Sequence, residues 1–137
     1  MDIANELKRI ILKEDFLETE RLLNNLFYEA DAIKYVENLI LLMEKNPNTD
    51  FGMPGPVVHF IEKFNETEYV DILIASLKRN PTNHTLWMLN RIINDSSSTN
   101  RTFYVQILYE ISQREDVNLN TRKLAQEFYN YQKGGVC

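Results

Sequence analysis

Hydrophobic residues recur every three or four positions along almost the whole chain, which is the spacing of one face of an α-helix. In the first segment these positions are Ile3, Leu7, Ile10 and Ile11. No segment alternates strictly between apolar and polar residues, as a half-buried strand does, over more than four residues. The pattern therefore predicts an all-α protein.

Polar and proline-containing breaks divide this pattern into eight expected helices. Asp15 and Glu18 resemble a capping box at the start of the second helix. We expect the third helix to run from about Asp31 to Lys45 and Thr67 to cap the fifth. Two segments are expected to be irregular: Thr49–Pro56, whose Pro54 and Pro56 both suit the first turn of a helix, and the polar loop Asp95–Thr99.

The breaks indicate how the helices are arranged. Asn46-Pro47, Asn80-Pro81 and Arg114-Glu115 recur at a spacing of 34 residues, with roughly two helices between them. This predicts an irregular HEAT-like stack of antiparallel helical hairpins, and a compact helical bundle is the alternative. We expect a single all-helical domain over residues 1–133 and a flexible C-terminal tail over 134–137.

Charge bears on the kind of partner. The chain holds 15 Lys and Arg against 20 Asp and Glu, a net charge of −5. We predict no direct contact with nucleic acid, because phosphate binding requires clustered cations, whereas an acidic surface suits a basic protein. Glu6, Lys8 and Arg9 interrupt any signal-peptide pattern, and Leu39–Met43 is too short to cross a bilayer. The sequence predicts a cytoplasmic protein without membrane contact.

Catalytic and metal-binding patterns are missing from the sequence. His59 and His84 lie on different expected helices, and neither has partners at metal-ligand spacing. The one thiol, Cys137, is the last residue, and the four glycines form no phosphate-binding loop. We therefore predict no enzyme, no cofactor and no metal. The competing hypothesis is a hydrolase that uses His59 or His84 with a nearby carboxylate.

One helical face combines an aromatic ring with polar tips. His84, Trp87, Met88 and Arg91 recur at offsets of three and four, so they share one face of the helix expected over Asn83–Asn94. Trp and Arg are enriched at interaction hot spots. The alternative is that Trp87 packs in the core and Arg91 pairs internally. Residues of neighbouring helices that could extend this face are Tyr69, Asp71 and Tyr104.

Two short motifs carry a family resemblance. They are Gly52-Met53-Pro54-Gly55-Pro56 and Trp87-Met88-Leu89-Asn90-Arg91, within a stretch from about Phe51 to Asn94. This stretch resembles the all-helical immunity proteins of bacterial polymorphic toxins, including those of contact-dependent growth inhibition. The resemblance implies a cytosolic antidote that binds one cognate toxin domain, often a nuclease, and blocks it without turnover.

Such families diversify at their contact surfaces, so the shared motifs can mark scaffold. Toxin contacts are therefore expected on exposed acidic and aromatic residues around Asp50, Glu66, Glu68, Tyr69 and Asp71. The leading hypothesis is a toxin inhibitor that acts by protein–protein contact. The alternative is a helical scaffold or adaptor that binds a peptide or protein in its groove.

Overall fold

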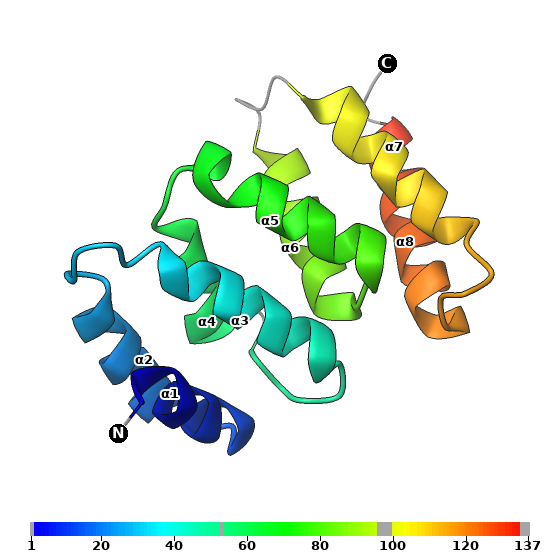
Figure 1. Ribbon diagram of the computed structural model, residues 1–137. Helices are drawn as coiled ribbons and strands as arrows, with labels where there is room; N and C mark the ends of the chain where they lie inside the picture. Colours follow the sequence, from blue (N-terminus) through cyan, green and yellow to red (C-terminus); the bar gives the residue numbers. More distant parts are fainter. Residues whose placement is uncertain (1, 53, 96–99, 135–137) are drawn as a thin grey trace. The chain divides into compact units, whose positions relative to one another are not determined.

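The computed structural model describes residues 2–52, 54–95 and 100–134, which form eight α-helices and no strand (Figure 1). The predicted all-α class is confirmed, while the HEAT-like stacking stays a prediction. No helix among the described residues has both the length and the apolar character that a bilayer crossing requires. The helices are α1 (Ile3–Leu12), α2 (Phe16–Leu26), α3 (Lys34–Lys45), α4 (Gly55–Glu62), α5 (Glu66–Arg79), α6 (Asn83–Asn94), α7 (Arg101–Ser112) and α8 (Leu119–Gly134).

The chain divides into two compact units, Met1–Ala75 and Ser76–Cys137. The division falls inside α5. The expectation of a single domain over residues 1–133 stays a prediction.

In the first unit, α1 contacts α2 and α3, and α2 packs against α4. Asp2 caps the start of α1, and its carboxylate accepts a hydrogen bond from the backbone N–H of Ala4 at 3.0 Å. Such a cap satisfies an N–H group that has no partner within the helix. The predicted apolar stripe of α1 is buried at Leu7, Ile10 and Ile11.

An aromatic cluster joins the end of α2 to α4. The Phe27 ring meets Phe60 and Phe64 edge to face, with centroid distances of 6.2 and 5.4 Å. The Lys63 ammonium lies 5.1 Å from the centroid of Phe27. Edge-to-face aromatic pairs add to the stabilisation that comes from burial alone.

The capping box predicted for α2 is half formed. The Asp15 carboxylate accepts a hydrogen bond from the Glu18 N–H at 3.1 Å. The Glu18 carboxylate, however, accepts from Arg21 Nε at 3.0 Å. The side chain that would complete the box is thus paired with the next turn of the helix.

The third helix starts later than predicted. Asp31 has a backbone φ of 60°, in the left-handed region, so it cannot belong to a right-handed helix. Hydrogen bonds to the carbonyl three residues back lead into α3, among them Lys34 N–H to Asp31 O at 3.0 Å. The expected start at Asp31 is therefore wrong, and α3 begins at Lys34.

The segment before α4 is irregular, as predicted, and hydrogen bonds fix its backbone conformation. The backbone N–H of Asp50 donates to the Glu14 carboxylate at 2.9 Å, and the N–H of Gly52 donates to Asp50 Oδ1 at 2.8 Å. Gly52 has a φ of +90°, and a Cβ on it would stand 2.5 Å from the Cα of Gly55. Only glycine fits such a position without a backbone shift. Pro56 lies in the first turn of α4, as predicted, whereas Pro54 precedes the helix as its N-cap.

The predicted cap of α5 is wrong. Thr67 lies inside the helix, which begins at Glu66. The Glu68 carboxylate instead reaches back and accepts a hydrogen bond from the Asn65 N–H at 3.1 Å. The cap is thus provided by a side chain from the first turn of the helix.

In the second unit, α6 contacts α7 and α8, and α7 packs against α8. A complete capping box starts α6: the Thr82 N–H donates to Thr85 Oγ1 at 3.0 Å, and the Thr85 N–H donates to Thr82 Oγ1 at 3.2 Å. The apolar stripe of this helix is buried, as at Leu86 and Leu89.

A polar network connects the three helices of the second unit. The amide nitrogen of Gln132 donates to Asn90 Oδ1 at 2.8 Å and to Asn94 Oδ1 at 2.7 Å. Arg101 donates to Gln132 Oε1 at 2.8 Å and to the carbonyl of Ile93 at 2.8 Å. The Gln132 side chain is buried. Its two amide hydrogens and its oxygen all have partners, as a buried amide requires.

The turn between α7 and α8 is tied to the end of α5. Arg114 donates to the carbonyls of Leu77 and Lys78, at 3.2 and 3.0 Å. It also pairs with Asp116 at 2.7 Å. A cation at these carbonyls satisfies groups that the end of a helix leaves without partners.

Two predicted irregular segments lie largely outside the described residues. These are the loop at 95–99, of which only Asp95 is described, and the C-terminal tail with Cys137. The helix α8 extends to Gly134, one residue beyond the predicted domain boundary.

Candidate functional site

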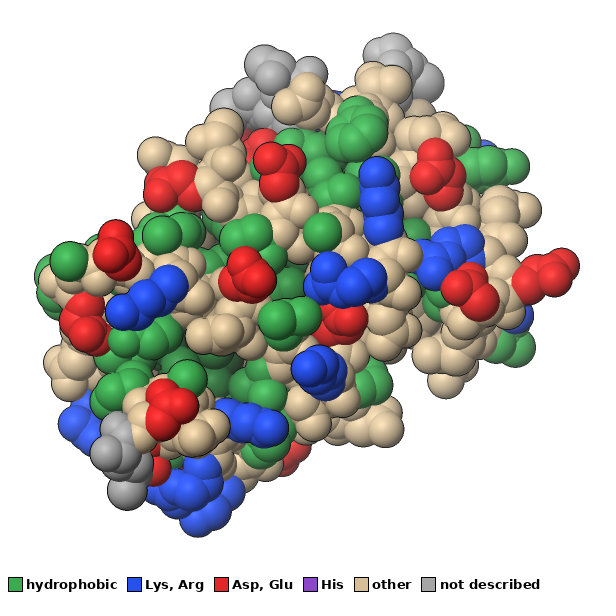
Figure 2. Space-filling view, in the orientation of Figure 1, with side chains coloured by type: hydrophobic (Ala, Val, Ile, Leu, Met, Phe, Trp, Pro, Cys, Tyr) green, Lys and Arg blue, Asp and Glu red, His purple; other side chains and the backbone are tan. Residues whose placement is uncertain are grey.

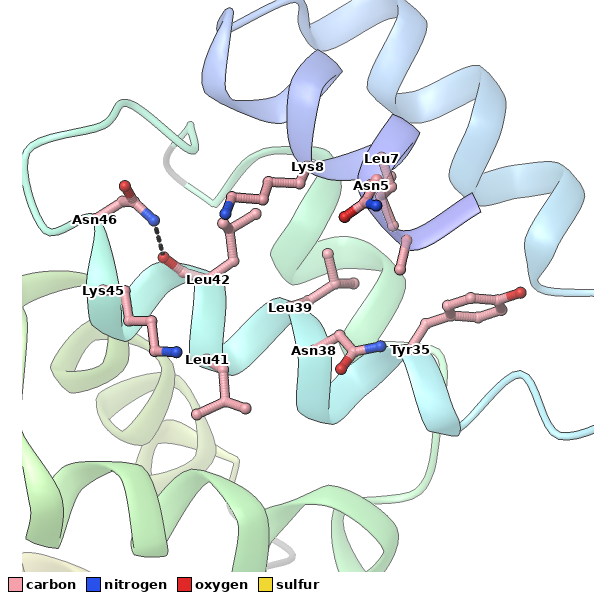
Figure 3. A pocket seen from close by; sticks show the side chains of 11 residues that line it. Asn5, Leu7, Lys8, Tyr35, Asn38, Leu39, Leu41, Leu42, Lys45 and Asn46 are labelled. Atoms are coloured by element: carbon pink, nitrogen blue, oxygen red, sulfur yellow. Dashed lines mark hydrogen bonds between the residues drawn. The ribbon is translucent and has the colours of Figure 1, made fainter. Parts of the chain in front are cut away.

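A groove runs along α3 in the first unit, bordered by α1 (Figure 3). Its volume is about 370 Å³, at the lower end of the range of ligand pockets. Both helices contribute apolar side chains to it, namely Leu7 from α1 and Leu39, Leu41 and Leu42 from α3. In the space-filling view, hydrophobic side chains reach the surface over this part of the unit, with both cationic and acidic side chains nearby (Figure 2).

The sequence of α3 explains why the groove is apolar. The run Leu39–Met43 is longer than one helical stripe can place on one side. Leu39, Ile40 and Met43 are buried in the core, at no more than 1% exposed. Leu41 and Leu42 are half-buried, and in the close-up Leu42 points toward α1 while Leu41 points away from it (Figure 3). These two leucines therefore leave apolar surface in contact with solvent.

The rim of the groove is polar and cationic. Lys8 and Asn5 on α1 and Lys45 and Asn38 on α3 line it, and all four are exposed. In the close-up, Lys8 extends toward the Leu42 end of α3 (Figure 3). No Asp or Glu occurs among the described residues that line the groove. The local charge is thus opposite in sign to the net charge of −5 of the chain.

Tyr35 closes one end of the groove. Its ring is buried, and its hydroxyl donates to the Glu29 carboxylate at 3.3 Å. Burial raises the pKa of the Tyr35 hydroxyl, and the negative charge of Glu29 raises it further. The hydroxyl therefore stays protonated and keeps its donor role at neutral pH. At the other end, the Asn46 amide donates to the Leu42 carbonyl at 2.9 Å.

Five of the predicted contact residues belong to the first unit. Asp50, Glu68 and Asp71 are exposed, as expected, and Glu66 is half-buried. Asp50 and Glu68 hold backbone N–H groups, so both have a structural role. Tyr69 is only 6% exposed. The expectation that its ring is exposed is wrong, because the apolar face of α5 includes this position.

The other four belong to the second unit. Trp87 is half-buried and packs edge to face on Phe128, with ring centroids 4.8 Å apart. His84 is half-buried and Arg91 is exposed. Tyr104 is 2% exposed, so the expectation that it extends an exposed face is also wrong. The face of α6 therefore offers Arg91 and the outer edges of His84 and Trp87 for contact.

The surroundings of His59 bear on the hydrolase hypothesis. His59 is exposed at a second pocket, of about 430 Å³, between α2 and α4, where Glu20 and Glu62 also lie. Among the described residues, no group of three His, Cys, Asp or Glu side chains is placed to hold a metal ion. The hydrolase hypothesis thus has two carboxylates beside His59, and it stays a hypothesis.

The groove was missed by sequence reasoning. It depends on α1 and α3 lying side by side, which the periodicity of a single helix does not reveal. The available signal was the five-residue apolar run in α3, since such a run exceeds what one core-facing stripe needs.

Part of the two motifs that carried the family resemblance occupies scaffold positions, whereas Arg91 is exposed and Trp87 half-buried. Met88, Leu89 and Asn90 are buried, and Gly52 shapes the loop before α4. Comparison of the chain with protein-family models, with curated proteins and with solved structures gives no match.

Proposed function

We propose that this protein acts by binding another protein, without catalysis of its own. The observation that carries the proposal is the groove along α3, where Leu41 and Leu42 present apolar surface between exposed lysines and asparagines. An apolar floor with a polar rim is the anatomy of a protein-binding surface. Burial of that floor by a partner provides affinity, and the rim provides specificity.

Exposed hydrophobic side chains outside the groove support the same proposal. Leu17 is 82% exposed and Tyr28 is 87% exposed, both in the first unit. Scattered apolar residues are common on protein surfaces. Here they add contact area to a unit that already carries an apolar groove.

The partner we propose is a bacterial toxin domain that this protein neutralises. This part of the proposal rests on the resemblance of the Phe51–Asn94 stretch to immunity proteins. The acidic net charge suits a basic partner such as a nuclease. A helical adaptor that binds a peptide or protein in the groove is the second candidate, and the groove itself favours it.

Capture with a neighbouring gene product tests the proposal. The tagged full-length chain is co-expressed with the polypeptide encoded immediately upstream, and co-purification and protection of the cells are measured. A stable complex that removes toxicity supports the inhibitor. A stable complex without any toxicity supports the adaptor, and the absence of a complex argues against both.

A matched variant separates binding from catalysis. Replacement of both His59 and His84 by Ala leaves protection and binding unchanged if contact through the groove along α3 is the mechanism, because neither histidine lines that groove. Loss of protection in a variant that still folds and still binds its partner would revive the hydrolase hypothesis.

A further inference from the structure

We infer that the groove along α3 binds an acidic amphipathic segment of the partner protein, with apolar side chains on the leucines and carboxylates at Lys8 and Lys45. The inference rests on the proposed function, because it names what the partner brings to that groove. It runs against the net charge of −5, which by itself suggests a basic partner.

The first support is the charge of the lining. Two lysines and no carboxylate occur among the described residues that line the groove, although acidic residues outnumber basic ones in the chain. A like charge opposite these lysines would be repelled, and an opposite charge is attracted. The rim therefore selects carboxylates.

The second support is that both lysines are available. In the described part of the chain, Arg9 pairs with Glu6 and Arg21 with Glu18, so these exposed cations have partners. No such ion pair is found there for Lys8 or Lys45. A partner carboxylate can thus approach either ammonium without breaking an existing pair.

The third support concerns the kind of molecule that fits. A volume of about 370 Å³ accommodates a few side chains. Asn5 and Asn38 on the rim each offer a donor and an acceptor, which match the amide groups of a peptide backbone. A lipid chain has no such groups, so the lining favours a protein segment.

Selection from a displayed library of random short peptides on the immobilised full-length protein tests the inference. We expect the enriched peptides to combine leucine-like or aromatic residues with Asp or Glu. Enrichment of neutral or basic peptides, or no enrichment over an uncoated support, would overturn the inference.

The best enriched peptide is then synthesised with a fluorescent label and measured by anisotropy. Lys45→Glu and Lys8→Glu should each weaken its binding about five- to tenfold, since each replaces an attraction by a repulsion. Lys123→Glu on α8 changes the net charge equally at an exposed position outside the groove, and it should leave the affinity within about twofold. Equal binding by all three variants contradicts the inference.

Two further measurements make the outcome unambiguous. If circular dichroism shows that Lys45→Glu or Lys8→Glu does not fold, Lys45→Gln and Lys8→Gln are measured in their place. Sedimentation with vesicles that contain anionic phosphatidylglycerol tests the lipid alternative, and vesicle binding that needs both lysines, without any peptide binding, would overturn the inference. A captured partner protein that binds Lys45→Glu and Lys8→Glu as well as the parent chain leaves the proposed function standing and removes only the groove from it.

Discussion

At the scale of single residues, exposure could not be predicted for the tyrosines. Tyr69 and Tyr104 were expected on an exposed face, and both are buried. Periodicity shows which side of its own helix a residue occupies, but not which neighbour covers that side. For Trp87 the sequence left core and interface open, and its half-buried ring against Phe128 has features of both.

Gln132 is the residue whose polar contacts matter most for stability. Gln132→Leu keeps much of its volume but removes the partners of Asn90, Asn94 and Arg101. Because buried polar groups without partners are costly, we expect a loss of about 2–3 kcal/mol in the free energy of unfolding, measured with urea. Gln126→Leu on the same helix is the control, since the Gln126 side chain donates to Asn130 at an exposed site. Equal losses for the two variants would show that the network contributes nothing particular.

Two glycines with similar backbone angles should respond differently to alanine. Gly52 and Gly55 have φ values of +90° and +78°, but only at Gly52 does an added Cβ meet backbone, 2.5 Å from the Gly55 Cα. Gly55→Ala should therefore cost about 1 kcal/mol, from the left-handed conformation alone. Gly52→Ala should cost clearly more. Thermal unfolding of both variants measures the difference, and the reverse order would contradict this account of the loop.

At the scale of helices, the number of elements could be predicted and two of their starts could not. Eight helices follow from the local spacing of apolar residues, which each segment carries by itself. The start of α3 depends on the positive φ of Asp31, and the start of α5 depends on the Glu68 carboxylate reaching back to Asn65. At each of these two starts, several neighbouring residues can cap the helix with nearly equal free energies. Small differences between them therefore decide at which residue the helix begins.

The turn between α7 and α8 should make stability depend on pH. The hydrogen bond from Arg114 lowers the pKa of the Asp116 carboxyl below its ordinary value. A carboxyl with a lowered folded-state pKa stabilises the fold above its unfolded-state pKa and loses that contribution as the pH falls through its folded-state pKa. Asp116→Asn should therefore be less stable than the parent chain at neutral pH, and the difference should vanish in strong acid.

Chemical unfolding across this pH range measures the effect. A double-variant cycle provides the control: in an Arg114→Ala background, the effect of Asp116→Asn on stability should depend less on pH, because the hydrogen bond and charge of Arg114 are absent and only the backbone hydrogen bond of Asp116 still lowers its pKa. A pH dependence of undiminished size in that background would show that Arg114 is not its cause.

At the scale of the whole molecule, net charge and site charge have opposite signs. The net charge of −5 led to the prediction of a basic partner and of acidic contact residues. The groove along α3 instead presents Lys8 and Lys45. A sum over the sequence cannot show where charges of one sign gather, because that depends on which helices lie side by side.

Hydrogen exchange on the complex with a captured partner locates the contact. If the groove is the site, exchange should slow in α1 and α3 on binding, while α8 serves as the internal reference. Slowing confined to α6, around Arg91, would move the contact to the face predicted from the sequence. Either result is compatible with a binding protein, and only the first supports the groove.

The amide network around Gln132 also constrains how this sequence can drift. Three side chains from two other helices depend on one carboxamide, so a change at position 132 alone leaves several of them without a partner. Natural variants should therefore keep positions 90, 94, 101 and 132 together or exchange them as a set for apolar residues. Lys8 on α1 and Lys45 on α3 have no such mutual dependence. Each can therefore be substituted separately as the surface of a partner protein changes during evolution.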